Sequence, residues 1–277
     1  MMTQGTKKLP YAPIQGNLVP DGIRAILQDQ EIKIVCPEPQ ADGGSVFTAG
    51  AEMVLSGYAD AMVVHLPEVP AIRPGALGDL AITALSARYS PVQGLEIHPD
   101  SLDMNQDLRL KAGSKIYVPS DADGIQLSCI NPDITWQVCQ PQETGSDLLP
   151  RFISASQGFT DLNLSEGSQF ISVNVKEVIP EPGSGYWAFI ARREDFRVRK
   201  VLKKFHHPEE LVISNAERAI KLGNYADRIK VHVTRDKKGF FHVYAFDTHP
   251  SNPQKISFST SIASQITDLL ITKFTKT

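Results

Sequence analysis

His65 and Glu68 are the two residues in this chain of 277 whose types and placement best suit chemistry. They lie at the end of an apolar run from Ala61 to Leu66, which has the length of a buried strand. Ligands of open α/β sheets bind at the carboxyl ends of the strands, so we expect a ligand or a reaction beside these two side chains. The alternative interpretation is that Glu68 is a solvated residue at a strand end.

The neighbouring segments must position this strand end. The apolar spacing of residues 51–55 predicts a helix packed on a core, and Gly57 ends it. A helix over Asp21–Gln28 and a strand over Glu31–Cys36 are expected before it, and a strand ending at Leu85 after it. Alternating strands and helices are typical of a parallel sheet, so the first part of the chain is predicted to be an α/β lobe.

The rest of the chain has its own patterns. A strand over Lys115–Val118 is followed by Ser120, which suits the cap of a helix. Other predicted elements are a β-rich run over 134–140, a helix and loop over 152–168, a strand over 169–182, helices over 196–205, 208–223 and 261–274, and a hairpin of 228–234 with 240–246. For a turn over 236–239 we expect Val233 opposite His242, with His232 on the other face, so no metal site is predicted there.

Composition indicates an ordinary globular chain, with 42% hydrophobic and 21% charged residues. We expect a cytoplasmic protein, because no apolar run is long enough to span a membrane and the first residues lack the apolar core of a secretory signal. The chain is also expected to be a monomer. Three cysteines without CxxC spacing, Cys36, Cys129 and Cys139, favour core thiols in a reduced compartment. Neither nucleic acid nor membrane is expected as a partner.

Charge is distributed unevenly along the chain. Residues 1–150 contain 9 Lys and Arg against 18 Asp and Glu, whereas residues 151–277 contain 19 against 13. The first half therefore has a net negative charge, which is unfavourable for binding a polyanion.

Several segments resemble one known family. SVFTAGAE (Ser45–Glu52) and DAMVVHLPEVP (Asp60–Pro70) are similar to a helix start and a strand end of hydroxymethylbilane synthases, also called porphobilinogen deaminases. These enzymes join four porphobilinogens into a linear tetrapyrrole. GTKKLPYAPIQ (Gly5–Gln15), EVIPEPGSGYWAFIARRED (Glu177–Asp195) and SNAERA (Ser214–Ala219) extend the resemblance.

The resemblance implies roles for individual residues. Glu68 matches the catalytic aspartate, whose carboxylate stabilises the positive charge that develops on a pyrrole nitrogen as ammonia leaves; Glu68 could act in this way in a dry cavity. Substrate binding is implied for Lys7, Lys8, His65, Arg88 and Ser120. Lys7 stands where the family has an arginine, and it lacks the planar two-pronged donor geometry of that residue.

The sequence also departs from the family. The family's dipyrromethane cofactor is attached to a cysteine after the helix that SNAERA resembles, and no cysteine occurs from Gln140 to the C-terminus, so no cofactor is expected here. Val92 and Gln93 replace an Arg-Asp pair, and Ala122 and Asp123 replace two arginines. Asp123 has the wrong sign for an acidic ligand, so a plain helix cap is the favoured interpretation of Ser120.

The family fold implies three domains: two α/β lobes like those of periplasmic binding proteins and a small α+β domain at the C-terminus. We place domain 1 at residues 1–84 and 172–195, domain 2 at 85–171 and domain 3 at 196–277. The leading hypothesis is a porphobilinogen deaminase-like protein of tetrapyrrole biosynthesis with impaired or lost polymerisation.

Two alternatives stay open. The chain could be a non-catalytic two-lobed module with a pyrrole or another small molecule in the cleft between the lobes. It could also be an interaction module using the basic helix over 196–205, although a solvated outer face is the favoured interpretation of those charges. Tyr186 and Trp187, which replace small residues of the family, could fill the space of a cofactor or pack at a domain boundary.

Overall fold

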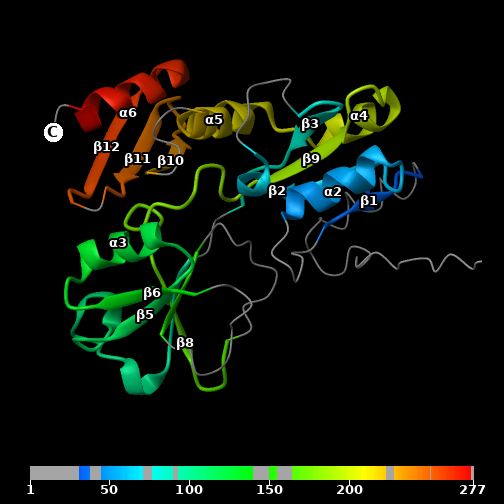
Figure 1. The fold of residues 1–277 in the computed structure, drawn as a ribbon. Helices are drawn as coiled ribbons and strands as arrows, with labels where there is room; N and C mark the ends of the chain where they lie inside the picture. Colours follow the sequence, from blue (N-terminus) through cyan, green and yellow to red (C-terminus); the bar gives the residue numbers. More distant parts are fainter. Residues whose placement is uncertain are drawn as a thin grey trace, which may run out of the picture. The chain divides into compact units, whose positions relative to one another are not determined.

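The computed structural model describes residues 31–37, 45–70, 77–89, 93–139, 150–154, 164–222, 228–249 and 251–275. In these residues the fold is mixed α/β with three sheets (Figure 1). It divides into two compact units. Unit 1 contains Met1–Ala87 and Trp187–His207, and unit 2 contains Arg88–Tyr186 and Pro208–Thr277. In the part of the chain that is described, none of the helices combines the length and apolarity needed to cross a membrane.

Unit 1 contains a four-stranded sheet in the order β1-β2-β9-β3. Its strands are β1 (Ile34–Val35), β2 (Ala61–His65), β3 (Leu80–Leu85) and β9 (Trp187–Arg192). β1 and β2 are parallel as expected, but β9 lies between β2 and β3 and is antiparallel to both. The strand predicted over Glu31–Cys36 is confirmed in position, but the observed strand is shorter. The predicted helix over Asp21–Gln28 lies outside the described residues.

Two helices belong to the same unit. Helix α2 (Val46–Leu55) is capped by Ser45, whose hydroxyl accepts from the backbone N–H of Thr48 at 3.4 Å, and Gly57 follows at φ +76°. Helix α4 (Phe196–Leu202) continues into a 3₁₀ turn over Lys203–Phe205. The apolar face of α4 is buried in the core with Val63, Phe189 and Ala191, which confirms the amphipathic pattern.

Unit 2 contains a five-stranded sheet in the order β6-β5-β7-β4-β8. Its strands are β4 (Gly94–Ile97), β5 (Lys115–Val118), β6 (Thr135–Val138), β7 (Arg151–Ile153) and β8 (Gln169–Ser172), and helix α3 covers Asp121–Ile130. Short 3₁₀ turns cover Pro99–Ser101 and Asp107–Arg109. The prediction of a helix and loop over 152–168 is wrong at Phe152, because this residue is the buried centre of β7 and pairs with Leu95. The strand expected over 169–182 ends at Ser172.

Unit 2 also contains an antiparallel sheet of β10 (Ile229–Arg235), β11 (Phe241–Asp247) and β12 (Gln254–Thr260). Helices α5 (Pro208–Ala219) and α6 (Ile266–Thr275) lie beside this sheet (Figure 1), and their apolar residues share one core with it. 3₁₀ turns over Ile220–Leu222 and Ala263–Gln265 adjoin the two helices. Thr234, not Val233, is opposite His242, so the predicted register is wrong by one residue and His232 shares a face with His242.

Candidate functional site

His65 is the last residue of β2, and Trp187, its register partner on β9, stacks against it. The two ring centroids are 3.7 Å apart and the ring planes are inclined by 36°. Burial lowers the pKa of His65 to about 4. The imidazole is therefore neutral near pH 7, where it can donate or accept a hydrogen bond without a formal charge.

Glu68 lies three residues further on, at the end of the 3₁₀ turn Leu66–Glu68, and it is exposed. The structure thus brings His65 and Glu68 to the same strand end, next to Trp187. The backbone N–H of Trp187 donates to the hydroxyl of Ser86 at 3.0 Å, which fixes the start of β9 at this edge. The arrangement offers a neutral aromatic surface and an exposed carboxylate within unit 1.

Arg88 of unit 2 has its guanidinium fully engaged inside the protein. It donates to the carboxylate of Glu217 at 2.7 Å, to the carbonyl of Val233 at 2.6 Å and to the carbonyl of Ser184 at 3.1 Å. It also lies over the ring of Tyr186, 4.7 Å from the centroid. Only 12% of the side chain is exposed, so few donors are left for a ligand.

The partner of Arg88 is a completely buried carboxylate. Besides the guanidinium, Glu217 accepts from the backbone N–H groups of Gly183 at 2.8 Å and Val233 at 2.7 Å. Burial alone would lower the pKa of Arg88, but the negative charge of Glu217 outweighs it and raises that pKa above its ordinary value. Burial raises the pKa of Glu217, whereas Arg88 and the backbone N–H groups of Val233 and Gly183 act to lower it. Because all of its donors belong to the protein, this pair is a structural clamp.

Ser120 caps helix α3, which confirms the favoured interpretation of that residue. Its hydroxyl accepts from the backbone N–H of Asp123 at 3.2 Å and donates to the carboxylate of Asp123 at 2.7 Å. The other oxygen of Asp123 accepts from the ammonium of Lys230 at 2.7 Å, and Lys230 also lies 3.2 Å from Glu181. The helix start is therefore neutralised by side chains of the protein itself.

Lys230 is 4% exposed and lies on β10, on the sheet face away from α5 and α6. Burial alone would lower the pKa of Lys230, but Asp123 and Glu181 together raise it. The pKa of Glu181 is lowered, because Lys230 and Lys221 outweigh the burial that would raise it. These charges form one buried ion cluster, in which Lys230 stays protonated.

Tyr186 and Trp187 differ in their surroundings. Tyr186 is fully buried, and its hydroxyl donates to the carboxylate of Glu210 at 2.7 Å on helix α5. Trp187 is partly buried against His65 and the core of unit 1. Tyr186 is thus a packing residue of unit 2, whereas Trp187 lines the strand end of unit 1.

The other predicted site residues are distributed as follows. Lys7 and Lys8 lie outside the described residues. His65 and Glu68 belong to unit 1, whereas Arg88 and Ser120 belong to unit 2 and are held in two different clusters. Within the described ranges, no group of three or more His, Cys, Asp or Glu is placed to hold a metal ion.

Sequence reasoning missed the roles of Glu217, Lys230 and Glu181. For Lys230 the available indication was its position between Ile229 and Val231 in a predicted strand, whereas Glu217 lies between Ala216 and Arg218 and had no such indication. Such residues in buried elements require a partner, although the pattern does not say which one.

Comparison with known proteins gives low sequence similarity to porphobilinogen deaminases. The chain is 23% identical over 203 residues to a probable porphobilinogen deaminase of Nitrosopumilus maritimus, covering 69% of this chain and 64% of that protein, which is less than two thirds of its length. It is 27% identical over 232 residues to the porphobilinogen deaminase of Limosilactobacillus reuteri, covering 77% and 74%. No family model matches the chain.

Among solved structures, the chain is similar to the periplasmic VFT2 domain of BvgS from Bordetella pertussis, with a TM-score of 0.33 and 13% identity. The match covers 72% of this chain and 95% of that domain.

Proposed function

We propose that this protein is a porphobilinogen deaminase-like protein of tetrapyrrole biosynthesis that does not polymerise porphobilinogen. One observation carries the proposal: the sequence has no cysteine between Gln140 and Thr277, so the thiol that would tether a growing chain is missing. The curated relatives at 23% and 27% identity support the connection to tetrapyrroles. The three-domain division given above is part of this proposal.

The charged partners of Arg88 and of the helix start at Ser120 support the proposed loss of polymerisation. A growing tetrapyrrole adds carboxylates with each ring, and each buried carboxylate without a partner costs several kcal/mol. Arg88 is engaged by Glu217, and the helix start at Ser120 is occupied by Asp123 and Lys230. Neither position is free to neutralise an acidic chain.

Glu68 is the residue through which some reactivity towards a single pyrrole would act. It is exposed three residues after His65, where its carboxylate can approach a cation. A carboxylate close to a developing positive charge stabilises that charge, and the effect is largest where water is excluded. We propose Glu68 as the catalytic residue of any residual activity, with His65 beside it in substrate binding.

The test is incubation of the purified protein with porphobilinogen. Intact-mass analysis would detect covalent addition of pyrrole units, and absorbance after oxidation would detect porphyrin. We expect neither, whereas the deaminase of Limosilactobacillus reuteri as positive control gives both. A porphyrin product that disappears in Glu68→Gln would contradict the proposal and show an active synthase.

A second candidate function is a non-catalytic small-molecule-binding module. The His65–Trp187 stack favours it, because an aromatic surface beside a neutral imidazole suits a flat apolar ligand. Binding of pyrrole compounds would then quench the fluorescence of Trp187, and Trp187→Phe would remove that change while Trp136→Phe would not. Quenching that persists in Trp187→Phe would exclude this surface.

A further inference from the structure

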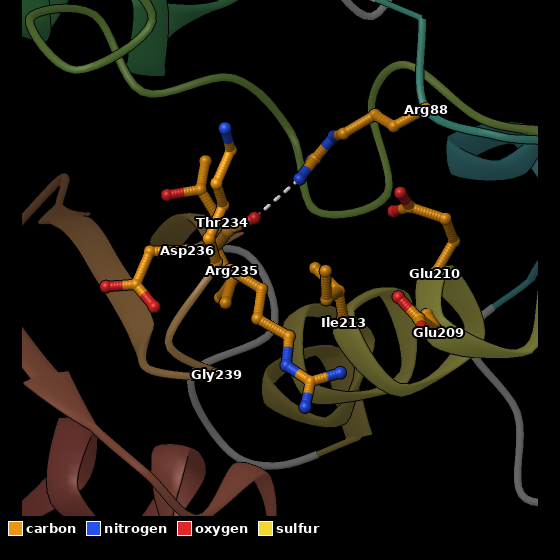
Figure 2. Close-up of a pocket in the computed structure, with 10 residues that line it drawn as sticks. Arg88, Glu209, Glu210, Ile213, Thr234, Arg235, Asp236 and Gly239 are labelled. Atoms are coloured by element: carbon orange, nitrogen blue, oxygen red, sulfur yellow. Dashed lines mark hydrogen bonds between the residues drawn. The ribbon is translucent and has the colours of Figure 1, made fainter.

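A pocket of about 480 Å³ opens in unit 2 between the first turns of helix α5 and the end of β10. Figure 2 shows Arg235 extending from β10 towards α5, on which Glu209, Glu210 and Ile213 lie. The turn after β10 contributes Asp236, Lys237 and Gly239. None of the residues proposed above for catalysis lines this pocket.

Three of the six charged residues in the lining are already engaged. Arg88 pairs with Glu217, and Glu210 accepts from the hydroxyl of Tyr186. Asp236 accepts from the backbone N–H groups of Lys238 and Phe240, at 2.8 and 2.9 Å, and faces His242. Their charges fix the shape of the pocket and are not available to a ligand.

The other three charged residues are available. Within the described part of the chain, the side chains of Glu209, Arg235 and Lys237 have no ion-pair or hydrogen-bond partner. All three are exposed. The guanidinium of Arg235 lies over the ring of Phe241, 5.4 Å from its centroid. This cation–π contact restricts the conformations of the side chain and leaves its N–H donors available. The pocket thus presents two cations and one anion.

We propose that this pocket binds a small zwitterion with one ammonium group and two carboxylates. Arg235 and Lys237 would each take a carboxylate, and Glu209 would take the ammonium. The buried side chains of Ile213 and Val233 form an apolar floor for the carbon skeleton. Acidic amino acids and porphobilinogen both have this set of groups, so they are two sources of one ligand chemistry.

The ligand chemistry is inferred from charges of unit 2 alone, whereas porphobilinogen as its source rests on the proposed function. Four small molecules, tested by titration calorimetry with the full chain, show which groups of the ligand the pocket requires. L-glutamate and porphobilinogen carry all three groups, glutarate lacks the ammonium and 4-aminobutyrate lacks one carboxylate. We expect saturable binding of L-glutamate or porphobilinogen, and binding of the other two that is weaker by about fivefold.

Substitutions in the pocket test which side chain binds which group of the ligand. Arg235→Gln and Lys237→Gln should each weaken binding by about three- to fivefold, because each removes one exposed charge contact. Glu209→Gln should abolish the preference for L-glutamate over glutarate. The matched control is Lys238→Gln, on the same turn and outside the pocket lining, which should leave binding unchanged.

Two results would overturn the proposal. One is the absence of saturable binding of both L-glutamate and porphobilinogen at concentrations up to about 10 mM, because a specific site of this kind should have a Kd below that concentration. The other is an equal affinity of Arg235→Gln and Lys238→Gln. Porphobilinogen binding without covalent addition would support this pocket and leave the proposed function intact, whereas covalent polymerisation would contradict only the proposed function.

Discussion

At the scale of single residues, Glu217 is the most consequential side chain in unit 2. It is fully buried and receives three N–H donors, from Arg88, Gly183 and Val233. These donors come from three segments that are distant in sequence, so one carboxylate holds them together. A buried ion pair is costly to break, because the remaining charge has neither water nor a partner.

Glu217→Ala is therefore expected to lower the free energy of unfolding by about 3–5 kcal/mol, since Arg88 would be left buried and unpaired. Urea denaturation followed by circular dichroism measures the change. The control is Glu209→Ala on the same helix, an exposed position where we expect a change below about 0.5 kcal/mol. Equal losses in the two variants would show that the clamp contributes nothing specific.

His232 is expected to make the free energy of unfolding depend on pH. Its side chain is 4% exposed, and burial, with the nearby charges of Arg88 and Lys176, lowers its pKa to about 3. Between its ordinary pKa of 6.5 and this value, the unfolded chain binds a proton that the folded chain does not. This contribution to stability is fully present above pH 6.5 and is lost as the pH falls towards 3.

His232→Phe should therefore make the free energy of unfolding less dependent on pH between 6.5 and 4, the part of this window where denaturation is measurable. The measurement is a series of urea titrations at several pH values. His207→Gln, an exposed histidine, serves as control and should keep the slope of the unsubstituted protein. An unchanged slope in His232→Phe would refute the assignment.

At the scale of elements, backbone contacts limit substitution within the five-stranded sheet. A Cβ atom added at Gly94 on β4 would lie 2.2 Å from the carbonyl oxygen of Ile171 on the neighbouring strand β8. A backbone atom cannot move aside as a flexible side chain can. The close approach of β4 and β8 therefore requires glycine at this position.

Gly94→Ala is expected to destabilise the protein by about 1–3 kcal/mol, the usual cost of overpacking. Chemical denaturation measures it, and hydrogen exchange should show faster exchange of the β8 amides. Gly113→Ala is the control, because it meets no atom within 4 Å and is strained only by its φ of +76°. Its smaller loss should leave the amides of β8 unaffected.

Much of the secondary structure could be predicted from sequence. The strand over Lys115–Val118 and the helix capped by Ser120 follow directly from β-branched residues and a capping hydroxyl. Strand β12 was missed, although Ile256 and Phe258 alternate with polar residues as in a half-buried strand. The hairpin register was wrong by one residue, because the turn between Arg235 and Phe241 is longer than a four-residue turn allows.

The candidate site was less predictable. His65 ends strand β2 and Glu68 follows it, and local patterns suffice to place them there. The partners of Arg88 and Asp123 come from positions more than 100 residues away, and charge type alone does not select one partner among many. Tertiary packing decides such pairs.

At the scale of the whole molecule, unit 2 contains two separate apolar cores. One lies in the five-stranded sheet with α3, and the other lies between the three-stranded sheet and helices α5 and α6. Several polar contacts join them in the described residues: Lys230 with Asp123 and Glu181, Arg88 with Glu217, and Lys255 with the carbonyl of Glu177. Polar junctions of this kind are typical of boundaries between domains.

Lys230→Met should therefore uncouple the two cores. It leaves Asp123 and Glu181 without their common cation, and we expect calorimetry to show two thermal transitions in place of one for unit 2. Adding Asp123→Asn should recover part of the loss, because that change removes an unpaired charge. A single transition in Lys230→Met would show that apolar contacts, and not the ion cluster, couple the cores.

The ion pair between Asp123 and Lys230 also constrains how this protein can evolve. An arginine introduced at position 123 would place a guanidinium beside a buried ammonium, so this substitution alone should destabilise the fold. A basic helix start at this point would therefore need a second substitution at Lys230, and the two positions are expected to vary together.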